Sequence, residues 1–202
     1  MNHTHLMAII GLTVTLLLSS GCATVYTQHP ALADKAGPDV ASVYFIRTVP
    51  VYTNDFADAP VIIEFQDKKL LKLGEGAYTL LYLKPAKGEL KVNNNTLFTN
   101  QPSSQRVWKE RYYRFIAGRT YFIHIQQIDE EFRGIFYAPE LVSLQQAKQL
   151  VKHLRRMGAK AAAHPIDKLT HVAVPPEGAI KDEEPTLPED LYKSTPYMLD
   201  EK

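Results

Sequence analysis

The sequence predicts a mainly β protein, an antiparallel sandwich or barrel with one C-terminal amphipathic helix and a disordered tail. From residue 41, short runs of β-branched and aromatic residues alternate with turn residues, a pattern typical of such folds. The apolar spacing becomes helical only at Ser143. Residues 175–202 contain five prolines and eight acidic residues, a composition that cannot build a core. With 202 residues, 45% of them hydrophobic, the chain is long enough for one domain with a sizeable core.

The first half of the domain contains five predicted strands. The run "SVYFIR" is apolar on both faces, which indicates a central or covered strand. "VIIEF" over residues 61–65 follows, with alternate apolar side chains on one face. The stretch "KKLLKLGEGAYTLLYL" reads as a hairpin that turns at Gly74 and Gly76. A second turn at residues 85–88 then leads into "ELKV".

The second half begins with a long polar loop over residues 93–105, of a length that is often functional or mobile. "RYYRFIAGRTYFIHIQQI" then predicts two paired strands that turn at Ala117 and Gly118. In the later strand, Tyr121, Ile123 and Ile125 share one face, whereas Phe122, His124 and Gln126 share the other. A charged turn, "DEEFRG", separates this strand from a last one, "GIFYA".

A helix is predicted near residues 143–158. Ser143 and Gln146 form a capping box, and Gly158 is a natural residue just beyond a helix C-terminus. Apolar residues recur at helical spacing, and the opposite face is basic. Two interpretations stay open: a helix docked on the sheet with a solvated face, or a basic face docked on phospholipid headgroups.

The N-terminus has the features of an export signal. The apolar run "LMAIIGLTVTLLL" is shorter than the roughly 20 residues that span a bilayer, and small residues follow it. "LLLSSGC" resembles the lipobox of bacterial lipoproteins, although Ser19 stands where Leu is usual and the first residues lack Lys and Arg. The resemblance implies a signal peptide over residues 1–21 and a diacylglycerol-modified Cys22. The alternatives are an ordinary signal cut after Ala23 or a free cysteine in an uncleaved anchor.

Residues 22–40 are then expected to be the lipidated cysteine and a tether, since they lack periodicity. The domain itself spans residues 41–174, and an acidic, proline-rich tail spans 175–202. Under the sorting rule of many such lipoproteins, Ala23 in place of Asp favours the outer membrane, with the domain facing the periplasm.

The order of features in the body resembles a family of bacterial lipoproteins known only as a domain of unknown function. The matched features are "VYFIR", "LGEGAY", a Pro/Gly turn before "ELKV", "AGRTYFIHI" and the terminal helix. The resemblance implies a small β-sandwich, similar to transthyretin-like or carbohydrate-binding-like modules, and implies no known activity. The positions that carry it are Tyr44 and Arg47, Gly76 and Tyr78, and Gly118 and Tyr121.

The sequence contains no recognised catalytic motif, so we expect a protein that is not an enzyme and has no cofactor. The spacing of His164, Asp167 and His171 matches no metal-site pattern, and no metal site is predicted. A formal charge of +1 without a basic stripe argues against a nucleic-acid partner. Adjacent acids such as Asp129 and Glu130 are expected to be solvated in a turn.

Aromatic side chains form the candidate binding surface. Rings of this kind stack on glycans or anchor protein partners, unless the helix or the tether covers them. We therefore expect a lipid-anchored, non-enzymatic binding or assembly module, with an envelope protein or peptidoglycan as partner. The alternative is an enzyme or accessory factor that acts on cell-wall glycan. The candidate residues are Tyr44, Tyr78, Tyr82, Trp108, Tyr112 and Phe122.

Overall fold

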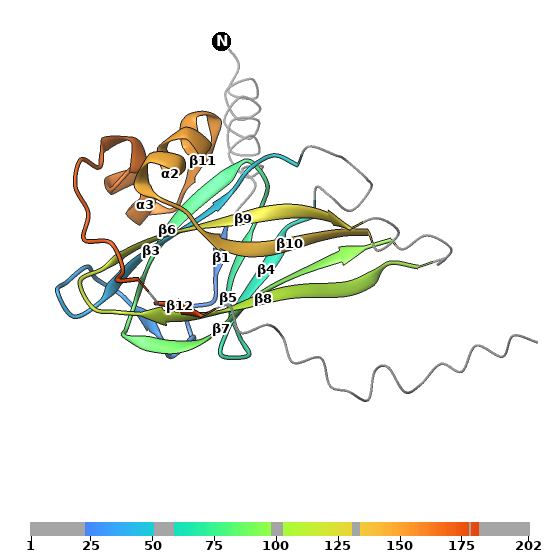
Figure 1. Cartoon of the computed structure of the whole chain (residues 1–202), viewed down its shortest axis with the longest axis horizontal. Coiled ribbons are helices and arrows are strands. Elements are labelled where there is room, and N and C mark those ends of the chain that lie inside the picture. The colour runs from blue at the N-terminus through green and yellow to red at the C-terminus, as the bar shows by residue number, and fades with distance from the viewer. Residues whose placement is uncertain (1–22, 51–58, 98–102, 131–133, 178, 182–202) are drawn as a thin grey trace, which may run out of the picture.

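Two β-sheets pack face to face in a computed structural model that describes residues 23–50, 59–97, 103–130, 134–177 and 179–181 (Figure 1). The predicted sandwich-like, mainly β fold is confirmed. In spatial order, sheet A contains β1 (Thr24–Val25), β5 (Lys68–Leu73), β4 (Val61–Phe65), β7 (Ala86–Thr96), β8 (Gln105–Phe115) and β12 (Ile180–Lys181). Sheet B contains β10 (Gly134–Leu141), β9 (Thr120–Glu130), β3 (Ala41–Arg47), β6 (Ala77–Leu83) and β11 (Arg155–Met157), and β2 (Leu32–Ala33) also pairs with β6.

The predicted strand faces fill the core between the sheets. Val61, Ile63 and Phe65 of β4 are fully buried there, because alternate residues of a strand point to the same face. Tyr121 of β9 and Phe115 of β8 meet edge to face, with ring centroids 5.1 Å apart. β3 is buried on both faces, as its sequence predicts.

Arg47 lies in this core at the end of β3 and joins the two sheets. Its guanidinium donates to the carbonyl oxygens of Ala59 and Leu73, at 2.9 and 3.0 Å. The same group lies 4.8 Å from the centre of the Tyr137 ring, on β10. A buried cation is stable only when hydrogen bonds replace its hydration, so these contacts fix the position of β3.

Two of the predicted hairpins are wrong. β5 and β6 follow one another in the chain, but β5 pairs with β4 and β1, whereas β6 pairs with β3. β8 and β9 likewise belong to different sheets. Gly76 and Gly118 have φ of 57° and 68°, so each glycine does make a turn, but the turn carries the chain across the sandwich. The later pair, β9 with β10, is an antiparallel hairpin as expected.

The predicted helix near residues 143–158 is shorter than expected. α2 (Leu144–Leu150) begins with the predicted capping box at Ser143, and the 3₁₀ turn η2 (Val151–His153) ends it. Residues 155–157 then extend and pair in parallel with β6, where Arg155 donates its N–H to Gly76 O at 2.9 Å. The edge of β6 supplies hydrogen-bond partners for the backbone N–H and C=O groups of residues 155–157, so the chain extends here and does not add another helical turn.

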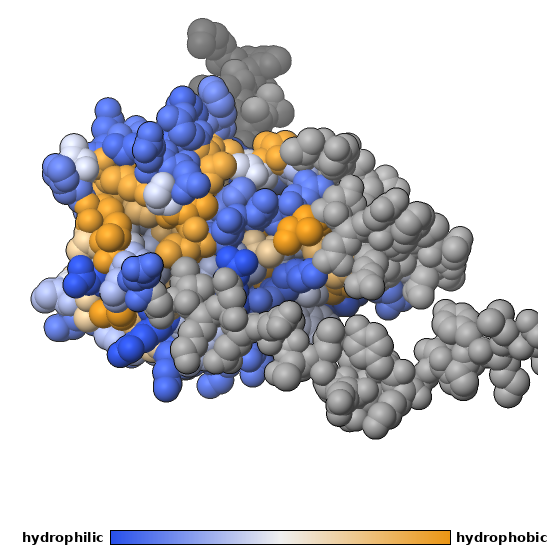
Figure 2. Space-filling view, viewed as in Figure 1, coloured by the Kyte–Doolittle hydropathy of each residue, from blue (hydrophilic) through white to orange (hydrophobic). Residues whose placement is uncertain are grey.

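Gly158 consequently precedes a helix instead of ending one. Its φ of 84° turns the chain into α3 (Ala159–Ala163), and the 3₁₀ turn η3 (Ile166–Lys168) follows. α2, α3 and the two 3₁₀ turns lie over the outer face of sheet B (Figure 1). In Figure 2, hydrophilic residues cover the outward side of this helical layer, and apolar residues appear where it meets the sheet.

The expectation of a free tether is wrong for residues 23–40. β1 pairs with β5 in sheet A, and β2 pairs with β6 in sheet B. Between them, His29 is 5% exposed; its Nδ1 accepts from the N–H of Ala31, and its Nε2 donates to Phe65 O at 3.0 Å. The segment closes one side of the sandwich, because it covers sheet edges whose backbone groups need partners.

The other terminal predictions lie mostly outside the described residues. Of the predicted tail, the described residues 175–177 and 179–181 do not extend away from the domain, because β12 pairs with β8 and Ala179 is buried. The signal peptide, Cys22 and residues 182–202 lie outside the described part of the chain. Within that part, no helix has both the length and the apolar character needed to span a bilayer.

Candidate binding pocket

The predicted aromatic surface does not exist as one exposed face. Tyr44, Tyr78, Tyr82 and Phe122 are between 1% and 5% exposed, because the helical layer covers them. Their side chains form a second apolar cluster together with residues of α2, α3 and the 3₁₀ turns. β3, β6 and the start of β9 are therefore buried on both sides, which is the alternative that the sequence left open, whereas Gln126 further along β9 is exposed.

The hydroxyls of Tyr44 and Tyr78, and the ring of Tyr82, have partners in the covering layer. The Tyr44 hydroxyl donates to His164 O at 2.8 Å, and Arg156 Nε donates to the Tyr78 hydroxyl at 3.2 Å. Lys160 Nζ lies 4.8 Å from the centre of the Tyr82 ring. Buried tyrosines need such partners for their hydroxyl or ring, and these contacts hold the helical layer on the sheet.

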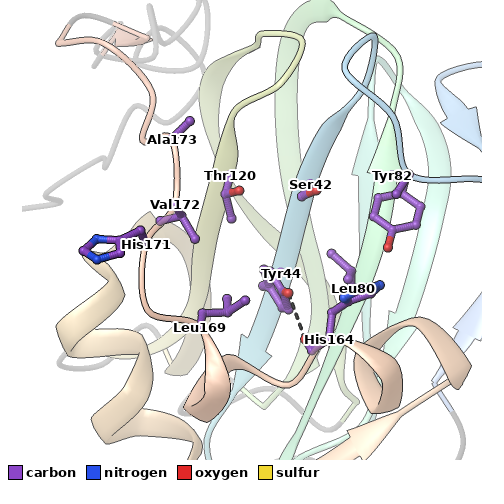
Figure 3. Close-up of a pocket in the computed structure, with 11 residues that line it drawn as sticks. Ser42, Tyr44, Leu80, Tyr82, Thr120, His164, Leu169, His171, Val172 and Ala173 are labelled. Carbon is purple, nitrogen blue, oxygen red and sulfur yellow. Dashed lines mark hydrogen bonds between the residues drawn. The ribbon is translucent and has the colours of Figure 1, made fainter.

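A cavity of about 320 Å³ remains beside Tyr44 and Tyr82 (Figure 3). Its floor is sheet B, with Ser42 and Thr120 on strands next to the tyrosines. Residues 164–173 cross in front of it, and Ala36 of the N-terminal segment completes the wall. This crossing segment is attached at both ends, since Tyr44 bonds His164 and the Thr120 N–H donates to Ala173 O at 2.8 Å.

The pocket has a polar lining. Its described residues include no Lys, Arg, Asp or Glu, and the polar groups are hydroxyls of Ser, Thr and Tyr together with the rings of His164 and His171. Burial raises the pKa of Tyr44, with smaller contributions from neighbouring Tyr82 and Tyr78. Burial also raises the pKa of Tyr82. Both phenols therefore stay protonated at neutral pH and act as neutral hydrogen-bonding groups.

The two remaining candidate aromatics lie on the other side of the sandwich. Trp108 and Tyr112 are on β8, on the outer face of sheet A, and Trp108 is 52% exposed. Lys91 Nζ, from the neighbouring strand β7, lies 5.9 Å from the centre of the Trp108 ring. The structure thus separates these two residues from the four that lie beneath the helical layer.

A smaller cavity, of about 280 Å³, lies between α2 and the β9–β10 hairpin. His124 and Glu140 face each other across the hairpin and line this cavity. His124 Nε2 lies 3.3 Å from the hydroxyl oxygen of Thr48. Burial lowers the pKa of His124, while the Glu140 carboxylate acts in the opposite direction. His124, on the strand face that the sequence assigned to Phe122 and Gln126, therefore lines a cavity.

No metal site is formed by the part of the chain that the structure describes. In that part, no group of three or more His, Cys, Asp or Glu residues is close enough to hold an ion. Asp167 is hydrogen bonded to Arg156 at 3.1 Å, whereas His164 and His171 are in the pocket wall. The segment "HPIDKLTH" therefore contributes to the pocket wall and does not form a metal site. The sequence did not identify Ser42 and Thr120 as pocket residues, because a hydroxyl residue in a strand has no distinguishing sequence pattern.

No family model, curated protein or solved structure matches the chain. The resemblance to bacterial lipoproteins stays a prediction from the sequence. The pocket on sheet B and the placement of the N-terminal segment are the structural features on which a function can be based.

Proposed function

We propose that this protein is a lipid-anchored cell-envelope protein at the periplasmic face of the outer membrane, and that its sandwich is a non-enzymatic binding module. The observation that carries the binding role is the hydroxyl-lined pocket beneath residues 164–173. Small-molecule sites are concave and orient their ligands with a few fixed polar groups, and this pocket is concave and carries such groups. The "LLLSSGC" stretch supports the anchoring.

The lining favours a small ligand group that carries hydroxyls or amides. It offers hydroxyls and imidazoles as hydrogen-bonding partners and contains no Lys, Arg, Asp or Glu among the described residues. The cavity of about 320 Å³ is near the lower limit for ligand sites, roughly 300 Å³, so it holds one small group. An N-acetylated sugar unit of cell-wall glycan has this chemistry.

Titration calorimetry with N-acetylglucosamine and its β-1,4-linked dimer tests the binding role. Tyr82→Phe and Thr120→Val each remove one hydroxyl from the pocket, so we expect each to weaken binding about fivefold, the value of one net hydrogen bond. Tyr112→Phe, on the outer face of sheet A, is the matched control and should leave affinity unchanged. Absence of binding, or equal losses in all three variants, would contradict the proposal.

Release of reducing ends from purified peptidoglycan distinguishes the binding role from the alternative, an enzyme or accessory factor that acts on cell-wall glycan. Binding without turnover supports a binding module. Turnover that is abolished by His124→Gln would establish the enzyme, since His124 lines a cavity and lies against the Thr48 hydroxyl.

Cell fractionation together with mass spectrometry of the mature N-terminus tests the anchor. Cys22→Ala should move the protein from the membrane fraction to the soluble fraction. Ser19→Leu, which restores the usual lipobox residue, is the matched control and should retain the lipid. A mature chain that begins elsewhere, or an unmodified cysteine in the wild type, refutes the anchor without affecting the pocket.

A further inference from the structure

The chain is fixed to sheet A almost at once after Cys22. Only Ala23 separates Cys22 from β1, whose Thr24 and Val25 pair with Lys72 and Leu71 of β5. Tyr26 continues this pairing by donating its N–H to Leu70 O at 3.1 Å. Two residues span at most about 7 Å. A lipid on Cys22 would therefore hold the β1–β5 edge of the sandwich against the membrane.

This edge carries three lysines on one strand. Lys68 and Lys69 of β5 are exposed and Lys72 is half-buried. Lys69 Nζ lies 6.0 Å from the centre of the Tyr26 ring. Clustered lysines beside a lipid anchor attract anionic headgroups, and tyrosine is favoured at the membrane–water interface.

The nearby carboxylates are engaged with other cations. Glu64 is opposite Lys69 in the sheet, but it forms an ion pair with Arg106 at 3.1 Å. Asp67, next to Lys68, lies 3.2 Å from Lys91 Nζ, which also pairs with Glu110 at 3.2 Å. Lys91 and Arg106 thus bring two positive charges against the three carboxylates, and the three β5 lysines bring the local net charge to +2.

We propose that the β1–β5 edge is the membrane-facing side of this protein, and that Lys68, Lys69 and Lys72 contact anionic phospholipid headgroups. The inference rests on the lipidated Cys22 of the proposed function. Each lysine near an anionic surface contributes about a fivefold preference for that surface. A lipid anchor becomes stably held and oriented when a basic patch adds a second attachment.

The basic residues of the helical layer are the competing surface. Lys148 and Lys152 lie in α2 and η2, above the outer face of sheet B, whereas Lys69 and Lys72 belong to sheet A. Arg155 donates to Glu75 O at 3.1 Å, and Arg156 is bonded to Asp167. The anchor fixes the β5 edge near the membrane. Lys160 of α3 lines a cavity together with Val25 and so also lies near the anchor, whereas Lys148 and Lys152 are not among the residues that line it.

Lysine acetylation followed by mass spectrometry tests the orientation in one sample. The full lipidated protein is reconstituted into phosphatidylcholine vesicles with or without about 30% phosphatidylglycerol. We expect labelling of Lys68 and Lys69 to fall at least threefold, by rough estimate, on the anionic vesicles and to recover at about 0.5 M salt. Labelling of Lys148 and Lys152 should stay constant. Protection of those two residues instead, or of no lysine, overturns the proposal.

Two further forms of the protein keep this test independent of the anchor. If Cys22 carries no lipid in cells, its thiol can be coupled to a maleimide-bearing lipid in the same vesicles, so orientation is measured although the lipoprotein proposal has failed. A flexible linker of about ten residues, inserted between Cys22 and Ala23, releases the edge from the surface. It should abolish the protection of Lys68 and Lys69, and protection that persists would show that the short connection is not the cause.

Discussion

Removing the Tyr44 hydroxyl tests whether one hydrogen bond holds the pocket wall in place. The hydroxyl donates to His164 O at 2.8 Å, and the ring stacks on Phe122 with centroids 5.2 Å apart. Tyr44→Phe keeps this stacking and deletes only the bond. A net hydrogen bond contributes roughly 1 kcal/mol, and a carbonyl left unsatisfied costs somewhat more. We therefore expect a loss of about 1–2 kcal/mol in the free energy of unfolding.

Tyr44→Phe should destabilise residues 164–173 locally as well as lower the global free energy of unfolding. Residues 164–173 would then be held to sheet B by the buried Ile166, by the bond between Asp167 and Arg156, and by the Thr120 N–H that donates to Ala173 O. Amide hydrogen exchange in this segment, at Lys168 and Leu169 for example, should accelerate in Tyr44→Phe. Urea unfolding followed by circular dichroism measures the global part, because Trp108 is too exposed to report reliably on the core.

Tyr121→Phe is the matched control for this prediction. The Tyr121 hydroxyl donates to Arg114 O at 2.7 Å and accepts from the Ile116 N–H at 2.9 Å, so two bonds at the β8–β9 connection are lost. The free energy of unfolding should fall by about 2 kcal/mol, with exchange in residues 164–173 unchanged apart from global opening. The reasoning is refuted if Tyr44→Phe leaves exchange in that segment at the wild-type rate.

The remaining predictions concern pH and backbone conformation. Burial lowers the pKa of His124 in the folded state, so its contribution to stability is complete above about pH 6.5 and declines as pH falls further. Urea titrations should therefore show a smaller decline for His124→Gln than for the wild type; equal declines would contradict this. Gly134→Ala should cost about 2–3 kcal/mol, because φ is 83° and the added Cβ would lie 2.5 Å from Thr96 Oγ1. Gly37→Ala is the control, because its added Cβ would meet nothing within 4 Å. Thermal melts of both variants should show a lower melting temperature for Gly134→Ala and a nearly unchanged one for Gly37→Ala.

The strands could be predicted from the sequence, but several of their partners could not. Alternation in "VIIEF" and in residues 121–126 identifies which side chains enter the core, since a strand's faces have a period of two. A glycine turn, in contrast, has the same local sequence whether it closes a hairpin or crosses between sheets. Gly76 and Gly118 both cross, and only the packing of whole sheets decides this.

The pocket was only partly predictable for a related reason. Tyr44 and Tyr82 could be named because they lie on strand faces opposite the core. Residues 164–173 have no periodicity, so nothing in the sequence indicates that they cross the outer face of sheet B. The parallel pairing of β11 with β6, which ends the helix early, depends on an edge that local sequence does not reveal.

The N-terminal segment runs from the proposed membrane-facing edge to the proposed binding pocket. Val25 lies in the strand next to the anchor position and also lines a cavity of about 310 Å³ beside β6. Ala33 and Asp34 line the same cavity, and Ala36, two residues further, lines the pocket on sheet B. A chain that follows the sheet edges in this way cannot act as a flexible arm. With a lipid on Cys22, the pocket would be held at a fixed height above the membrane, and its ligands would be groups that come within that distance of the lipid surface.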